Sequence, residues 1–275
     1  MKKVFLVVAA LIFLFSETIF SQIVVTPPYV LLRSSKKVSS YIVENRSDKT
    51  QEITIRFQFG YPYSDSVGNM GMKYDDTTAE KKYSIAENIS AFPKRFILQP
   101  RQQQTVRLSI HNAQNFTDGT YWARLITRAL PQQVFVDSVG AGVTTAINFA
   151  FEQITTVAYA AGNLSVSLEA EGKGIMIDSQ QVRVLWNAIK TGNSPFLGTV
   201  KFKLFDSRNN LIYDSFETVG IYQTMMKRTD FPIELFQSHS SYTVEFTIES
   251  ERSDIPAEDI VQTKPLIARF NFTLP

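Results

Sequence analysis

The sequence contains no cysteine among its 275 residues and only two histidines. Disulfides, thiol nucleophiles and cysteine-ligated metal sites are therefore excluded, so burial of apolar surface has to stabilise the folded chain. His111 and His239 lie far apart, and there is no His-Glu-x-x-His motif, phosphate-binding glycine loop or nucleophile elbow. We therefore expect no metal, no cofactor and no enzyme. A hydrolase built on paired carboxylates would leave no such local motif, and it remains as the third alternative.

The chain also lacks an excess of charge of either sign and a long apolar run. Its formal charge is +2, without the basic surplus that a nucleic-acid surface needs. Lys2 and Lys3 precede an apolar run from Val4 to Phe15, which is shorter than the roughly 20 residues of a membrane-spanning helix. This pattern predicts a secretory signal peptide over residues 1–21, cleaved after Ser21. We expect the mature protein to be exported and to carry no membrane anchor of its own.

Short segments in which apolar and polar residues alternate recur along the rest of the chain. "QEITIRFQFG" and "TYWARLITRALP" are examples, rich in β-branched and aromatic residues and bounded by turn-forming residues. The pattern predicts an all-β protein built from antiparallel sandwiches. It is interrupted at "AYAAGNLSV", which we interpret as a domain boundary. The expected domains are residues 22–160 and residues 161–275.

Two further features carry structural expectations. The segment "SDSVGNMGMKYDDTTAEKKYSIAEN", residues 64–88, has little strand character and is expected to form a mobile surface loop with a short helical turn at residues 78–83. Trp122 and Trp186 lie within alternating segments. We expect both tryptophans to be buried in sandwich cores.

The stretch "INFAFEQITTVAY", residues 147–159, places Ile147, Phe149 and Phe151 on one face of an extended strand. Alternation alone favours a strand whose hydrophobic face belongs to the core of its own sandwich. The alternative is a face that binds another chain.

Three segments together resemble the periplasmic pilus-assembly chaperones of the PapD type. They are "VVTPPYVLLRSSKKVSSYIVENRS", "FPKRFILQPRQQQTVRLSI", and "TYWARLITRALP" followed by "INFAFEQITTVAY". Members of that family consist of two immunoglobulin-like domains, and they lend the last strand of the first domain to an incomplete subunit. The resemblance implies a periplasmic protein of two immunoglobulin-like β-sandwich domains. Its partners would be an exported β-rich pilus or surface subunit and an outer-membrane usher, and the donated hydrophobes would be Ile147, Phe149 and Phe151.

The sequence departs from that family at the basic pair that holds the carboxylate at the end of the subunit. The position of the family's arginine falls on Pro27 and that of its lysine falls on Thr156, and neither residue is basic. The candidates for a replacement anchor are Arg33, Arg124 and Arg128. The main alternative to a chaperone is a structural or adhesive accessory protein of the cell envelope, in which every strand is paired within the chain.

Overall fold

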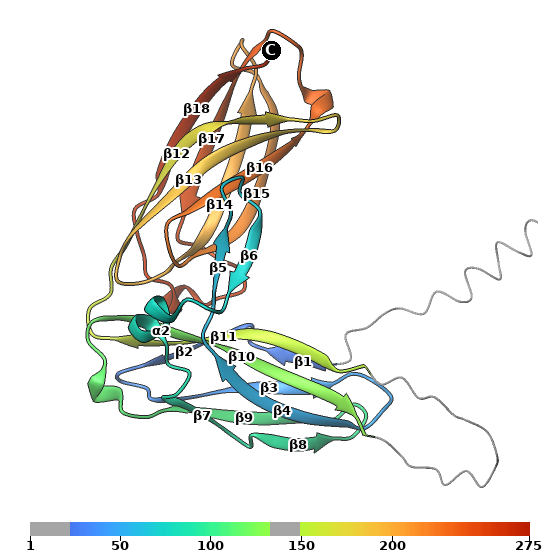
Figure 1. Ribbon diagram of the computed structural model, residues 1–275, viewed down its shortest axis with the longest axis vertical. Coiled ribbons are helices and arrows are strands. Elements are labelled where there is room, and N and C mark those ends of the chain that lie inside the picture. The colour runs from blue at the N-terminus through green and yellow to red at the C-terminus, as the bar shows by residue number, and fades with distance from the viewer. Residues whose placement is uncertain (1–22, 133–148) are drawn as a thin grey trace, which may run out of the picture.

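The computed structural model describes residues 23–132 and 149–275, which form two β-sandwiches set at an angle (Figure 1). The first sandwich lies within residues 23–161, and the second lies within residues 166–273. The all-β class and the sandwich architecture expected from the sequence are confirmed. The predicted signal peptide and Ile147 lie outside the described residues.

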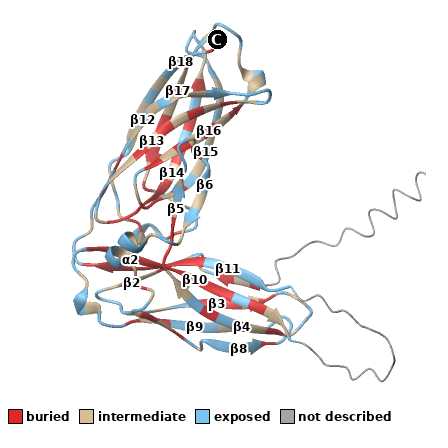
Figure 2. Cartoon of the chain, in the orientation of Figure 1, coloured by how far each residue is buried: buried red, intermediate tan, exposed pale blue. Residues whose placement is uncertain are grey.

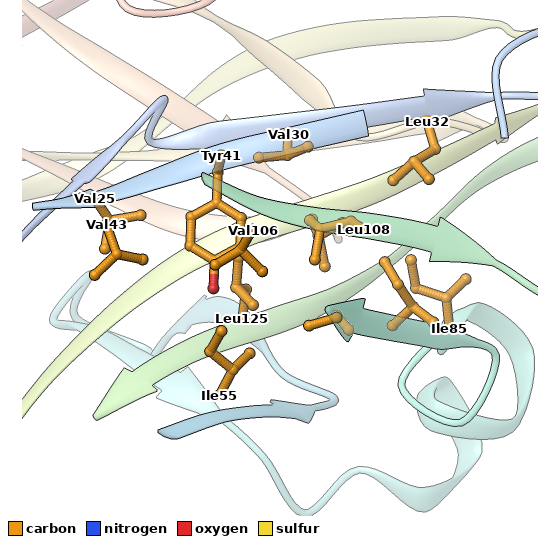
Figure 3. Packing of buried hydrophobic residues seen from close by; sticks show 14 of the residues in the cluster. Val25, Val30, Leu32, Tyr41, Val43, Ile55, Ile85, Val106, Leu108 and Leu125 are labelled. Atoms are coloured by element: carbon orange, nitrogen blue, oxygen red, sulfur yellow. The ribbon is translucent and has the colours of Figure 1, made fainter. Parts of the chain in front are cut away.

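The first sandwich consists of a four-stranded and a five-stranded sheet. The four-stranded sheet has the order β1 (Ile23–Thr26), β3 (Val38–Asn45), β9 (Gln103–Ile110), β7 (Ile89–Phe92). The five-stranded sheet has the order β2 (Tyr29–Arg33), β11 (Phe151–Ala161), β10 (Gly119–Pro131), β4 (Gln51–Gln58), β8 (Arg95–Leu98). Alternate side chains of β3 and β4 are buried, because successive residues of a strand point to opposite faces. Figure 3 shows these inward side chains filling the space between the two sheets.

The start of the chain changes from one sheet to the other at Pro27 and Pro28. β1 pairs antiparallel with β3, whereas β2 pairs parallel with β11. Proline has no N–H to donate to a ladder, so two consecutive prolines end the first pairing and allow the chain to cross. As a result β2 lies beside the second half of β11 and not beside its first half.

Residues 64–88 differ from the surface loop expected from the sequence. β5 (Tyr61–Ser64) and β6 (Met70–Lys73) form an antiparallel hairpin, which extends from the first sandwich along the second (Figure 1). A short helix, α2 (Thr77–Tyr83), follows and confirms the expected helical turn. Asp76 caps it, because the Asp76 carboxylate accepts the backbone N–H of Ala79 at 2.9 Å.

The second sandwich consists of a three-stranded and a four-stranded sheet. The first has the order β12 (Val166–Ile177), β13 (Gln181–Gly192), β16 (Met225–Pro232). The second has the order β15 (Leu211–Ile221), β14 (Phe196–Phe205), β17 (Ser241–Glu249), β18 (Leu266–Thr273). Short 3₁₀ turns occur at Ala113–Asn115, Ile233–Leu235 and Ala257–Asp259. Trp186 is fully buried against Phe202 and Phe246, which confirms it as a core residue of this sandwich.

The two sandwiches meet at a small cluster of buried residues, mainly aromatic, that is separate from the two sandwich cores. Trp122 of β10 is buried here and not in the core of the first sandwich, with its indole ring 4.8 Å from the ring of Tyr222. Its position corrects the expectation for Trp122, because an even-numbered residue of β10 points away from the space between the sheets. Thr120 and Ser194 also join the sandwiches through a buried hydrogen bond of 2.8 Å.

Candidate functional site

The first half of β11 is exposed, whereas its second half is buried (Figure 2). Phe149, just before the strand, is 75% exposed, and Phe151 is 39% exposed. Both have the same parity as Val157 and Tyr159, which lie in the core. The phenylalanines therefore lie on the inward face of the sheet but at the open end of the sandwich. They carry an apolar surface that the described part of this chain does not cover.

The same half of β11 also has an open backbone edge. β10 pairs with β11 along its whole length, but β2 pairs only with Thr156 to Ala160. The Thr156 N–H points toward β2, donating to the Pro28 carbonyl at 3.5 Å. Because backbone groups alternate in direction along a strand, Glu152 and Ile154 point their N–H and C=O groups toward the same side. Among the described residues no strand pairs with β11 on that side between Phe151 and Thr155, so the edge can accept a strand from another chain.

A cleft of about 330 Å³ begins where this open edge ends, between the two sandwiches. Thr156 and Pro28 lie at its first-sandwich side, next to Arg124 of β10. The second sandwich contributes Val219 and Tyr222, together with other apolar residues. The two positions at which the family resemblance leads us to expect basic residues therefore lie at, or one residue from, the wall of this cleft.

Arg124 is 8% exposed, and it makes several contacts that hold its guanidinium in place. Its Nε donates to the Gly60 carbonyl at 3.0 Å, and its Nη1 donates to the Thr156 hydroxyl at 2.5 Å. The guanidinium Cζ lies over the ring of Tyr222, 5.2 Å from the ring centroid. The remaining nitrogen, Nη2, is buried and has no hydrogen-bond acceptor among the described residues. A buried charge-bearing donor without an acceptor is costly, so this nitrogen favours an anionic ligand.

The other two cations that line the cleft are each neutralised by a carboxylate. Lys227 is buried and lies 3.2 Å from Glu217. Arg252 binds both oxygens of Asp254, at 2.6 and 2.9 Å. Among the described residues that line the cleft, Arg124 is therefore the cation whose charge no carboxylate balances.

The structure separates the other two predicted anchor candidates from this position. Arg33 forms an ion pair of 3.0 Å with Asp259, which ties the end of β2 to the second sandwich. Arg128 lies four residues further along β10, toward the end of the strand, exposed and 3.9 Å from Glu152. Three candidates, Arg33, Arg124 and Arg128, come from the sequence, and nothing local in the sequence singles out Arg124. Its contacts come from Gly60, Thr156 and Tyr222, which only the fold brings together.

The described ranges hold no group of three or more histidine, aspartate or glutamate side chains that could bind a metal ion. His111 donates to or accepts from the Ser90 hydroxyl at 2.7 Å, within the first sandwich. Within residues 23–132 and 149–275, no helix has both the length and the apolar character needed to cross a bilayer.

Comparison with known proteins gives similarity at the level of structure. No protein-family model matches the chain, and no curated protein sequence matches it. The crystal structure of the YadV chaperone is similar with a TM-score of 0.50 and 12% identity, over 91% of this chain and 100% of that one. The CupB2 chaperone of Pseudomonas aeruginosa has a TM-score of 0.47 and 11% identity, over 92% and 100% of the two chains. The CsuC–CsuE chaperone and tip adhesion subunit complex of Acinetobacter baumannii has a TM-score of 0.46 and 12% identity, over 90% and 98%.

The similarity to the YadV chaperone shows the fold of this chain, two immunoglobulin-like β-sandwich domains. The fold that the sequence resemblance implied is therefore correct.

Proposed function

We propose that this protein is a periplasmic chaperone that binds an exported β-rich pilus or surface subunit by donating the open half of β11. The observation that carries the proposal is the unpaired edge from Phe151 to Thr155, which bears exposed phenylalanines and leads into a cleft with an unpaired arginine. The similar structures include a chaperone in complex with a tip adhesion subunit. The proposed activity is binding without catalysis, and an outer-membrane usher is the proposed acceptor of the subunit.

Strand addition at this edge combines two kinds of interaction. The backbone groups of Glu152 and Ile154 pair with a strand of the subunit, and the phenylalanine rings enter its incomplete core. Burial of Phe149 and Phe151 contributes about 1.5 to 3 kcal/mol for each ring, before the cost of ordering both partners. Ile147 has the same parity and lies outside the described residues, and its role as the third donated hydrophobe stays a prediction.

Arg124 is the proposed anchor for the carboxylate at the end of the subunit. A carboxylate binds a guanidinium through its N–H groups, and Nη2 of Arg124 is the nitrogen that no acceptor among the described residues occupies. Nη2 supplies the free donor, and the contact between Nη1 and Thr156 fixes the plane of the group. This arrangement replaces the missing basic pair at Pro27 and Thr156 with a single buried arginine on the neighbouring strand.

The positions of the anchor and the open edge determine the direction of the bound strand. If the C-terminus of the bound strand lies at Arg124 and its earlier residues lie beside Phe151, the strand runs parallel to β11. It then lies on the same edge of β11 as β2, which is also parallel to β11. Thr156 lies directly opposite Arg124 in the register of β10 and β11. Phe151 precedes it by five residues, about 17 Å at 3.3 Å per residue. The anchor thus sets which residues of the subunit meet each phenylalanine.

The proposal is tested by isolating the protein from the periplasm and identifying bound proteins by mass spectrometry. The test variant carries Phe149→Asp and Phe151→Asp. The matched control carries Phe92→Asp and Ile97→Asp, which replace two exposed hydrophobes elsewhere on the first sandwich. We expect the wild type and the control to retain a small β-rich exported subunit and the test variant to lose it while keeping its circular dichroism spectrum. If no such subunit accompanies the wild type, the protein is an accessory of the envelope and not a chaperone.

A further inference from the structure

We propose that the cleft selects subunits whose chain ends in an apolar residue, and that Met70 and Met72 of the β5–β6 hairpin form the wall that receives that side chain. This inference rests on the proposed function, because it names the class of chain end that Arg124 holds. It concerns a part of the chain that strand donation itself does not use.

The hairpin presents one apolar face to the cleft. Met72 is paired with Pro62 and Met70 with Ser64, so the two methionines lie on the same side of the hairpin. Met70, Met72 and Pro62 all line the cleft that contains Arg124. Met70 is 51% exposed and Met72 is 39% exposed. Their side chains are therefore available to a ligand that already contacts the arginine.

Contacts with the second sandwich hold this hairpin over the cleft. Arg228 of β16 donates from Nη1 to the Asn69 side-chain oxygen at 2.7 Å, at the turn between the two strands. Gly68 in the same turn has φ +78° and lies so close to Arg228 that an added Cβ would be 2.7 Å from the arginine Cβ. The turn is thus fitted to β16, and the methionine wall has a fixed place relative to Arg124.

The opposite wall of the cleft is also mainly apolar. It includes Leu197, Val219, Ile221, Met225 and Ile255 of the second sandwich. Since Lys227 and Arg252 are already paired with carboxylates, an acidic side chain would find no free cation there and would lose its hydration. A basic side chain would enter a cleft that already holds three cations. The cleft therefore suits a ligand in which a carboxylate lies next to an apolar side chain, which is the chemistry of an apolar C-terminal residue.

The occupant follows from charge and from continuity with the strand edge. An internal peptide segment has no carboxylate on its backbone, and it leaves the Nη2 of Arg124 without an anionic partner. A second apolar strand from another molecule of this protein would not supply that group either. Methionine side chains adapt to ligands of different shape, so the wall selects a class of apolar residues and not one residue.

The inference is tested by NMR titration of the mature chain labelled with ¹³C at its methionine methyl groups. The probe is the hexapeptide acetyl-Gly-Ser-Gly-Thr-Val-Phe with a free carboxylate. Its controls are the same peptide as a C-terminal amide and the peptide that ends in aspartate. We expect the free acid to shift the methyl signals of Met70, Met72 and Met225, which line the cleft, and to leave Met176 of β12 unchanged. Absence of these shifts at millimolar peptide, or equal shifts with the aspartate peptide, overturns the inference.

A double variant, Met70→Ser with Met72→Ser, separates the wall from the anchor. We expect it to weaken binding of the phenylalanine peptide about tenfold and to bring its affinity close to that of a peptide ending in serine. Met176→Ser is the control, because Met176 is a partly exposed methionine away from the cleft. Unchanged affinity in the double variant overturns the role of the methionines.

The two proposals can fail separately. If the Phe149→Asp, Phe151→Asp variant loses its subunit but the peptides show no preference for an apolar end, strand donation holds and the selection of chain ends does not. If that variant keeps its subunit, strand donation is wrong, and the peptide titration still decides what the cleft binds.

Discussion

Arg124 combines burial with an incomplete set of hydrogen bonds, and this combination separates its structural role from its binding role. The Gly60 carbonyl that accepts from Arg124 also accepts from the Trp122 indole N–H at 3.1 Å, so it keeps a donor if the arginine is removed. Replacing a buried charge with an apolar group of similar length is often neutral or stabilising. The arginine is thus retained at a cost that a carboxylate ligand would offset.

At the residue scale we therefore predict that Arg124→Met keeps the free energy of unfolding of the free protein within about 1 kcal/mol of wild type. The same substitution should reduce the amount of co-isolated subunit about tenfold or more. Thermal unfolding and quantitative mass spectrometry measure the two effects. Arg128→Met is the control on the same strand, and it should change neither, because Arg128 is exposed and away from the cleft. A variant that keeps its subunit would remove Arg124 from the proposed site.

At the scale of the element, β11 has two edges with different tasks. Odd-numbered residues such as Gln153 direct their N–H groups to β10, and even-numbered residues such as Ile154 direct theirs to the open side. Proline removes an N–H, so it discriminates between the edges.

We predict that Ile154→Pro folds and loses the subunit, because the missing N–H belongs to the open edge. Gln153→Pro should instead destabilise the first sandwich by about 3 kcal/mol or more, since it removes a ladder hydrogen bond with β10. Urea unfolding and co-isolation from the periplasm distinguish the pair. Equal destabilisation by both prolines would mean that the outward N–H of Ile154 is already paired.

The turn of the β5–β6 hairpin depends on one carboxylate. The Asp65 pKa lies below its ordinary value, chiefly because the Asn69 side chain donates to its carboxylate, and the backbone N–H groups of Asn69 and Val67 add to this. A carboxylate with a lowered pKa in the folded state stabilises that state above its unfolded pKa of about 4. The stabilisation disappears as the pH falls through the lower, folded pKa.

We therefore predict that the contact between Asn69 and Arg228 persists as the pH falls to about 4 and is lost at lower pH. The methyl signals of Met70 and Met72 report this change in the NMR spectrum. In Asp65→Ala the same signals should show the loosened turn already at neutral pH. Signals of that variant that match wild type at neutral pH would show that Asp65 does not hold the hairpin.

At the scale of the whole molecule, the two sandwiches are joined by contacts in the cleft and beside it. Tyr222 is buried against Trp122 and covers the guanidinium of Arg124. Arg33 and Asp259 form an ion pair elsewhere at the junction. The cleft geometry and the coupling of the two sandwiches therefore depend on the same residues.

Tyr222→Ala is predicted to uncouple the sandwiches, because it leaves a cavity at the junction. We expect the free energy of unfolding to fall by about 3 to 5 kcal/mol. We also expect two calorimetric transitions in place of one cooperative transition. Phe246→Ala is the control, because Phe246 lies in the core of the second sandwich and its loss should lower the midpoint of unfolding while a single cooperative transition remains. A single transition in Tyr222→Ala would show that other contacts suffice to couple the two units.

The sequence by itself determined the all-β class, the two sandwiches and the alternation of buried and exposed residues along their strands. Ile53 and Ile55 illustrate the reason, since strand alternation is a local property and both residues are fully buried as it predicts. The hairpin at 61–73 was missed because its strands are short and interrupted by glycine and lysine. Trp122 was expected in a core and lies at the junction, since burial against another domain leaves the same apolar pattern as burial in a core.

Only the tertiary structure decided what the exposed strand and the arginines do. The sequence placed Phe149 and Phe151 on one face of a strand, but whether that face is exposed depends on where β2 stops beside β11. It named Arg124 among three candidates, but the unpaired Nη2 follows from contacts with residues 32 to 98 positions away. The pairing of a strand edge and the burial of a side chain both depend on residues that are close in space but distant in the sequence. A strand's own residues encode its two faces, and the rest of the chain decides which of its edges and charges remain unsatisfied.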